Sequence, residues 1–215
     1  QIILDVTREE SLSCYEIDAL STSDDGYKNW VDFMKTEAEY FQGLIPTLLI
    51  NPSESENMDA YKSNLTRQLD AFMSEFSGVA YRASILLDPV FLYDLILLEE
   101  TINRHLDAGK RFVIELDHEF IRPGTSLLLA ARTIGIIEKI TKILPMAELV
   151  ILSTSFPKFV TDLGDEEEDS FPLEEVFLHE EIAKNKGART VIHYGDYGSI
   201  NPIRNDQIIM RSGWR

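Results

Sequence analysis

Two carboxylates lie one residue apart at the end of an apolar stretch, in the segment RFVIELDHEF at residues 111–120. In an extended strand, Glu115 and Asp117 point to the same side, and they lie about 7 Å apart because each residue advances roughly 3.3 Å. Such a pair can act together through a water molecule or a divalent metal ion, and its oxygen ligands suit Mg²⁺ or Ca²⁺. Adding Asp5 or His193 would give a mixed site closer to one for Mn²⁺ or Zn²⁺. The alternative is a structural set of polar side chains at a strand end.

A second group of candidate residues lies in the segment HYGDYGSINP at residues 193–202. Its two glycines permit backbone conformations that are closed to other residues, and its Asn-Pro pair indicates a turn. Asp196 and Tyr197 are therefore expected on a tight loop, where they could serve in acid–base chemistry or in recognition. The alternative for both is a role in forming the turn. His193 is a candidate catalytic histidine, and a hydrogen-bonded core position is its alternative.

Three further polar residues are candidates for binding a substrate: Arg82, Asn51 and Ser155. Each lies in an apolar run or shortly after one. Arg82 would either form an internal ion pair with a carboxylate such as Glu115 or Asp117, or bind an anion. An ion pair there would disfavour a metal ion, because the guanidinium would already neutralise the carboxylates.

His118 has the opposite parity to the two carboxylates, so we expect it to leave the strand and enter the following loop. The chain contains no G-x-S-x-G, H-E-x-x-H, P-loop or G-x-G-x-x-G sequence. A serine hydrolase elbow, a zincin site and a dinucleotide-binding loop therefore have no support.

Six apolar runs rich in β-branched residues or leucine alternate with segments of helical periodicity. The runs cover residues 1–6, 44–50, 79–87, 111–116, 148–153 and 190–194. Between the second and third runs, apolar residues recur at the spacing of one helix face: Leu65, Leu69, Phe72, Met73 and Phe76. Strands and helices in this order predict βαβ units and a parallel sheet.

We expect a TIM-like (β/α) barrel that is partial within residues 1–215, with an open doubly wound sheet as the alternative. Polar side chains recur where the apolar runs end, as they do at the mouth of such a barrel. Alternation within the runs puts Phe112, Ile114 and Leu116 against helices, and it turns Ser155 toward the mouth. In this prediction the chain is a single β/α domain that lacks its first β/α unit and its C-terminal end.

Charge and composition restrict the classes of function. The formal net charge is −17 at pH 7, so the chain repels phosphate backbones and anionic lipid surfaces, and direct nucleic-acid binding is disfavoured. The acidic run at residues 162–170 is a candidate docking segment for a basic protein partner, and its alternative is a solvated loop. No apolar stretch reaches the roughly 20 residues of a membrane span. Cys14 is the only cysteine, which fits a reducing cytoplasm.

The segment YGDYGSINPIRNDQ, followed by GWR, resembles the beta protein family of phage and bacterial genomes. The shared pattern is an aromatic residue, G-D-Y, a proline after a short turn and a later G-W pair: Tyr194, Gly195, Asp196, Tyr197, Pro202, Gly213 and Trp214. The alternation of strands and helices agrees as well, whereas the family's opening strand with its lysine-rich stretch is absent. The resemblance implies a role in phage–host conflict. Asp196 and Tyr197 are the only candidate site residues that it assigns in this chain, and it assigns them as positions of the family motif.

The residues support two functional hypotheses. The first is a scaffold without its own catalysis that binds a protein partner in phage–host conflict, in anti-phage defence or as a phage accessory protein. The second is a metal-assisted phosphodiesterase or hydrolase with these candidate residues: Glu115, Asp117, His193, Asp196 and Asp5. An enzyme requires these carboxylates to converge in a pocket, whereas a scaffold requires only that they are paired.

Overall fold

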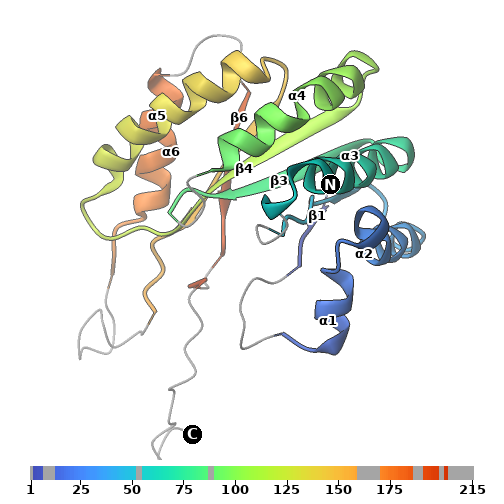
Figure 1. Ribbon diagram of the computed structural model, residues 1–215. Coiled ribbons are helices and arrows are strands. Elements are labelled where there is room, and N and C mark those ends of the chain that lie inside the picture. Colours follow the sequence, from blue (N-terminus) through green and yellow to red (C-terminus); the bar gives the residue numbers. More distant parts are fainter. Residues whose placement is uncertain are drawn as a thin grey trace, which may run out of the picture.

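The computed structural model describes residues 2–6, 13–51, 55–86, 90–158, 170–185, 191–198 and 201–202. Within these ranges, strands and helices alternate along the chain (Figure 1). The strands are β1 (Ile2–Leu4), β2 (Leu44–Pro46), β3 (Gly78–Ser84), β4 (Arg111–Phe120), β5 (Glu148–Thr154) and β6 (Ile192–Asp196). The helices are α1 (Tyr15–Leu20), α2 (Asp24–Glu37), α3 (Met58–Glu75), α4 (Phe91–Asp107), α5 (Ser126–Ile143) and α6 (Glu174–Asn185).

The paired strands run parallel, and their order in space follows their order in the chain. β1 pairs with β2, and β3, β4, β5 and β6 form a second sheet in that order. The two sheets meet where the Leu48 N–H donates to the Ala80 carbonyl at 2.8 Å, beside a single bridge between Thr47 and Ala80. Connections between neighbouring parallel strands share one hand, and α3, α4, α5 and α6 lie together on one side of the strands (Figure 1).

The two faces of the strands differ in what they contact. The large core lies between the strands and the helices, and it includes Phe112, Ile114 and Leu116 of β4. We call this side the helix face. The opposite face carries a small apolar cluster made of Ile3, Ile45, Ala80, Val113 and Val150. The predicted alternation of β4 is therefore confirmed, and the predicted apolar stripe of α3 is buried as well.

The expected TIM-like barrel is wrong. The chain is an α/β protein, but its described residues form two small parallel sheets of two and four strands, which is too few strands for a barrel of that class. β1 and β6 are edge strands in this part of the chain and do not pair with each other. The prediction failed because strand–helix alternation is a local signal that open and closed folds share, whereas closure depends on pairing between distant strands.

Two aromatic side chains of α2 form hydrogen bonds with the backbone that follows β2. Trp30 donates from its indole Nε1 to the Thr47 carbonyl at 2.8 Å. The backbone N–H of Asn51 donates to the hydroxyl of Tyr27 at 2.9 Å. These bonds satisfy backbone groups beyond the end of the strand, where ladder partners are no longer available.

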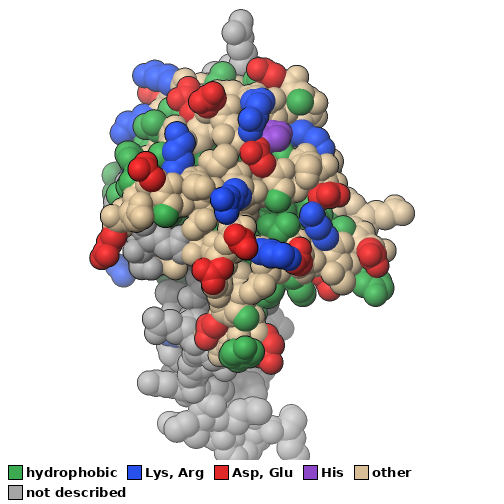
Figure 2. Space-filling model, turned by 45° about the vertical axis from the view of Figure 1, so that its right-hand side comes forward, with side chains coloured by type: hydrophobic (Ala, Val, Ile, Leu, Met, Phe, Trp, Pro, Cys, Tyr) green, Lys and Arg blue, Asp and Glu red, His purple; other side chains and the backbone are tan. Residues whose placement is uncertain are grey.

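The face of the molecule shown in Figure 2 carries charges of both signs. On the face shown in Figure 2, Asp and Glu side chains lie among Lys and Arg side chains, with hydrophobic side chains between them. Among the described helices, none combines the length and the apolar character that crossing a bilayer requires. Residues 162–169 of the acidic run and the Gly213 and Trp214 pair lie outside the described residues.

Candidate functional site

Arg82 and Asp117 form the centre of the candidate site, near the carboxyl ends of β3 and β4. Arg82 is in register with Glu115, and Ser84 is in register with Asp117, so these side chains share the face opposite the helices. The guanidinium of Arg82 reaches Oδ2 of Asp117 from Nε at 2.9 Å and from Nη2 at 2.7 Å. The side chain of Asp117 is only 1% exposed and that of Arg82 is 21% exposed, so this is a largely buried ion pair.

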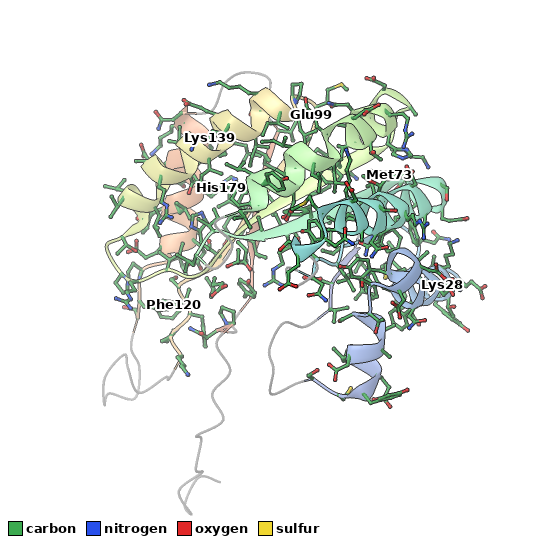
Figure 3. All side chains as sticks on the ribbon, viewed as in Figure 1. Lys28, Met73, Glu99, Phe120, Lys139 and His179 are labelled. Carbon is green, nitrogen blue, oxygen red and sulfur yellow. The ribbon has the colours of Figure 1, made fainter. Side chains whose placement is uncertain are left out.

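Two residues that follow the edge strands complete the cluster. Tyr197, directly after β6, donates its hydroxyl proton to Asp117 Oδ2 at 2.6 Å and accepts from Arg82 Nη2 at 2.7 Å. Asp5, directly after β1, accepts from Arg82 Nη1 at 3.2 Å. We call Asp5, Arg82, Asp117 and Tyr197 the strand-end network. Its members lie near or directly after the carboxyl ends of β1, β3, β4 and β6. Phe120, the last residue of β4, is labelled at this side of the molecule in Figure 3.

Electrostatics hold the network in its hydrogen-bonded state. Burial disfavours the charge on Arg82, but the carboxylates of Asp117 and Asp5 outweigh this effect and raise the pKa of the guanidinium. Burial and the charge of Asp117 raise the pKa of the Tyr197 hydroxyl, so that it keeps its proton at neutral pH. Tyr197 can therefore donate to Asp117 while it accepts from Arg82.

A β-bulge at the end of β4 fixes the carboxylate of Asp117. The register with β5 shifts between Asp117 and Phe120, and Glu119 has a φ of 56°, a left-handed value that is uncommon outside glycine. The Glu119 N–H donates to Asp117 Oδ1 at 2.8 Å, and its carboxylate accepts from the Ser84 hydroxyl at 3.0 Å. Both oxygens of Asp117 are thus hydrogen-bonded. Sequence reasoning missed Glu119 because no local pattern in the chain indicates a bulge.

Arg82 lies between two of the three predicted metal ligands. It contacts Asp5 and Asp117, and the third predicted ligand, Glu115, is buried in register with Arg82 itself. In the described ranges, no group of three or more His, Cys, Asp or Glu side chains is arranged to hold a metal ion. Among the described residues, the geometry is that of an ion-pair network, whereas the spacing of the carboxylates had suggested a site for a divalent metal ion.

His193 is not brought together with Glu115 and Asp117. It lies near the start of β6 and is exposed, and its Nε2 is 3.1 Å from Glu148 Oε2. Glu148, at the start of β5, also accepts from Arg111 Nε at 2.5 Å and from Nη2 at 2.6 Å. Hydrogen bonding to Arg111, and to a lesser extent to His193, lowers the pKa of Glu148 against the opposing effect of burial. His193 therefore belongs to a separate cluster toward the amino ends of the strands, and it is not a core histidine.

The other predicted site residues also lie apart from the network. Asp196 is exposed, and its Oδ1 accepts from a backbone N–H two residues later at 2.6 Å, which stabilises the turn after β6. Ser155 faces α6, because its hydroxyl bonds to the carboxylate of Glu175 and accepts from the Glu174 N–H at 3.2 Å. The predicted orientation of Ser155 is therefore wrong. Asn51 contacts α2 through its backbone N–H.

His118 remains in β4, so the prediction that it enters a loop is wrong. Its side chain is buried, with Nε2 3.0 Å from the Thr133 hydroxyl of α5. Burial lowers the pKa of His118 to about 4, while the charge of Asp117 acts against this shift and that of Arg132 adds to it. His118 is therefore a neutral core histidine at neutral pH.

The fold and the site define an α/β protein whose charged side chains at the strand ends are paired with one another. The chain matches the Beta protein family over residues 16–213 and belongs to that family, which confirms the resemblance in its sequence. It is similar to Protein beta of Enterobacteria phage P4, with 27% identity over 211 residues that cover 97% of this chain and 54% of that protein. The chain thus spans about half the length of this relative. No solved structure matches the chain significantly.

Proposed function

We propose that this chain is a binding module without catalysis of its own, through which a beta protein engages a protein partner in phage–host conflict. The pairing in the strand-end network carries the proposal. Asp117 accepts from two nitrogens of Arg82, from Tyr197 and from the Glu119 N–H. A general base or a metal ligand needs a carboxylate oxygen that can meet the substrate or the ion. A carboxylate with both oxygens engaged instead suits a rigid scaffold.

The charge of the chain supports a basic protein as the partner. A net charge of −17 attracts positively charged surfaces over a long range and speeds association with them. The same charge opposes contact with nucleic acid. The role in phage–host conflict is supported by the family and by the phage relative. We place this role in the host cytoplasm, where the exposed Cys14 thiol would stay reduced.

The test is to isolate the partner and to ask whether binding depends on charge. The affinity-tagged chain is purified from phage-infected bacteria, and a protein that co-purifies in stoichiometric amount is produced separately and titrated against it by calorimetry. We expect binding that weakens as salt is added, because salt screens the attraction between opposite charges. The double variant Arg82→Met/Asp117→Leu is the control, and it should bind equally well. A failure to find any stoichiometric partner, together with Mn²⁺-dependent hydrolysis of a phosphodiester by the purified chain, would contradict the proposal.

A metal-assisted hydrolase is the second candidate, and one observation favours it. Glu119 has a left-handed backbone conformation beside Asp117, and strain of this kind clusters at active sites. In a hydrolase, a metal ion would displace Arg82 and join Asp117 to Asp5 and Glu115. This candidate requires a metal-dependent rise in Tm that Asp117→Asn abolishes, whereas a binding module requires none.

A further inference from the structure

Two polar atoms on the helix face of the sheet are buried without a hydrogen-bond partner among the residues that the structure describes. They are Nδ1 of His118 in β4 and Oγ of Ser153 in β5. The two residues are only 2% and 1% exposed, respectively, and neither atom is bonded to a group in the described part of the chain. Buried polar groups are paired in nearly all native structures, because an unpaired one loses its hydration without compensation. Two such atoms together therefore indicate a bound group that pairs with both.

Both side chains point into the same region. Asp117 is in register with Leu152, so the residues that follow them, His118 and Ser153, are neighbours across the two strands. Each continues the alternation of a core residue two positions earlier in its strand, which places both on the helix face. The hydrogen bond from His118 to Thr133 of α5 agrees with this placement.

The hydrogen bond at the other ring nitrogen fixes the tautomer of His118. The Thr133 hydroxyl donates its single proton to the Leu129 carbonyl at 2.8 Å, so it must accept from His118 Nε2 at 3.0 Å. Nε2 therefore carries the proton, and Nδ1 is an acceptor. The Ser153 hydroxyl can donate or accept. A small group that donates to Nδ1 and forms a second hydrogen bond with Ser153 satisfies both atoms.

We propose that one water molecule binds between His118 Nδ1 and Ser153 Oγ, inside the β-bulge at the end of β4. Internal waters typically make about three hydrogen bonds to otherwise unsatisfied buried groups. The bulge offers further partners, because an extra residue in one strand leaves backbone groups outside the regular ladder. The same bulge places the Glu119 N–H on Asp117 Oδ1 at 2.8 Å. His118 and Ser153 thus act as positioning residues for Asp117 from the other side of the sheet.

Replacing Ser153 by alanine gives opposite results with and without the water. With the water bound, Ser153→Ala removes one of its hydrogen bonds, and Tm falls by several degrees. Without it, the substitution removes an unpaired buried hydroxyl, and Tm stays the same or rises. A Ser153→Ala variant that is as stable as the unmodified chain, or more stable, overturns the proposal.

Thr47→Val is the matched control. The hydroxyl of Thr47 is also buried without a partner in the described part of the chain. Thr47 bridges to Ala80, however, which belongs to the cluster on the opposite face. Valine keeps the shape of the side chain and removes the hydroxyl, so we expect Tm to stay the same or to rise. The opposite signs of the two changes separate loss of a water site from loss of an unpaired hydroxyl.

A crystal structure of Ser153→Ala distinguishes positioning of Asp117 from simple loss of packing. Without the water, the Glu119 N–H should move away from Asp117 Oδ1, to which it donates at 2.8 Å. Thr47→Val should leave this hydrogen bond in place. A crystal structure of the unmodified chain should show an ordered water within hydrogen-bonding distance of both atoms. A direct hydrogen bond between His118 and Ser153 in that structure would overturn the proposal.

Discussion

Asp117 lies in a nearly dry position, where Arg82 and Tyr197 take the place of water around its carboxylate. Two guanidinium nitrogens and one hydroxyl lie 2.6–2.9 Å from its Oδ2 atom. A buried ion is tolerated only when its partners are present in good geometry. The residues of the strand-end network therefore depend on one another, and the loss of one partner should cost more than a surface substitution.

Tyr197→Phe should lower the free energy of unfolding by roughly 1.5–3 kcal/mol, the range for hydrogen bonds to charged groups. The aromatic ring remains, while the hydroxyl that joins Asp117 to Arg82 is lost. Urea unfolding measures the difference. Tyr40→Phe is the control, because Tyr40 is 74% exposed and its change should stay within about 0.5 kcal/mol. Equal effects of the two substitutions would mean that the Tyr197 hydroxyl does not support the network.

His118 should make the protein less stable in mild acid. Its pKa is about 4 in the folded chain, against 6.5 for an unperturbed histidine, so between these values the unfolded state binds a proton that the folded state does not. The contribution of His118 is complete above pH 6.5 and is lost as the pH falls toward 4, by roughly 3 kcal/mol in total. Urea unfolding at a series of pH values measures this slope. The slope should be smaller in His118→Gln, and an unchanged slope would assign the acid sensitivity to other groups.

At the scale of elements, one carboxylate of α6 fixes the start of α5. Glu174 accepts from the Gly124 N–H at 2.7 Å and from the Ser126 N–H at 3.3 Å. The cap residue of α5, Thr125, forms no side-chain hydrogen bond of its own to the helix start. Burial disfavours the charge of Glu174, but these hydrogen bonds outweigh it and lower its pKa. The loop after β4 is thereby joined to the helix after β5.

Glu174→Gln should lower the free energy of unfolding by about 1 kcal/mol, as expected for the loss of a charged group at a helix start. The amide keeps one acceptor but loses the charge and the second acceptor. Differential scanning calorimetry measures the change. Glu180→Gln in the same helix is the control, because Glu180 is exposed and should leave Tm unchanged. A matching loss in both variants would point to the general charge of α6 rather than to the contact with α5.

At the scale of the whole molecule, local patterns were predictable and long-range pairings were not. The alternation of Phe112, Ile114 and Leu116 depends on neighbours in the sequence, and it is found in the large core. The Arg82 ion pair was foreseeable as one of two alternatives, since its strand was expected to lie near carboxylates. Sheet closure and the contacts of His193 depend on pairing and register between distant segments, which spacing within one strand does not encode.

Ser153 of β5 and Ser155, directly after this strand, show the same limit. Ile151 belongs to the core on the helix face, and Ser153 and Ser155 continue its alternation toward α6. Because Ser155 is polar and follows an apolar run, we expected it to point toward the mouth of the barrel instead. Composition alone could not choose between the faces, because a buried serine is accommodated wherever a partner such as Glu175 is available.

The central claim is that the strand-end network is structural, and a double-mutant cycle on Arg82 and Asp117 with and without Mg²⁺ or Mn²⁺ tests it most directly. The variants are Arg82→Met, Asp117→Leu and the double substitution, each measured by urea unfolding. We predict that each single change costs about 3–5 kcal/mol, because it leaves an unpaired buried charge, and that the double change costs much less than the sum. The metal ions should not stabilise the unmodified chain more than the double variant.

Two results would contradict a structural role for the strand-end network. If Asp117→Leu leaves stability unchanged or raises it, the carboxylate is retained for a purpose other than stability. If Mg²⁺ or Mn²⁺ also raises the Tm of the unmodified chain, and not that of the double variant, the carboxylates of the network bind a metal ion in place of Arg82. That outcome would favour the metal-assisted hydrolase over the binding module as the function of this chain.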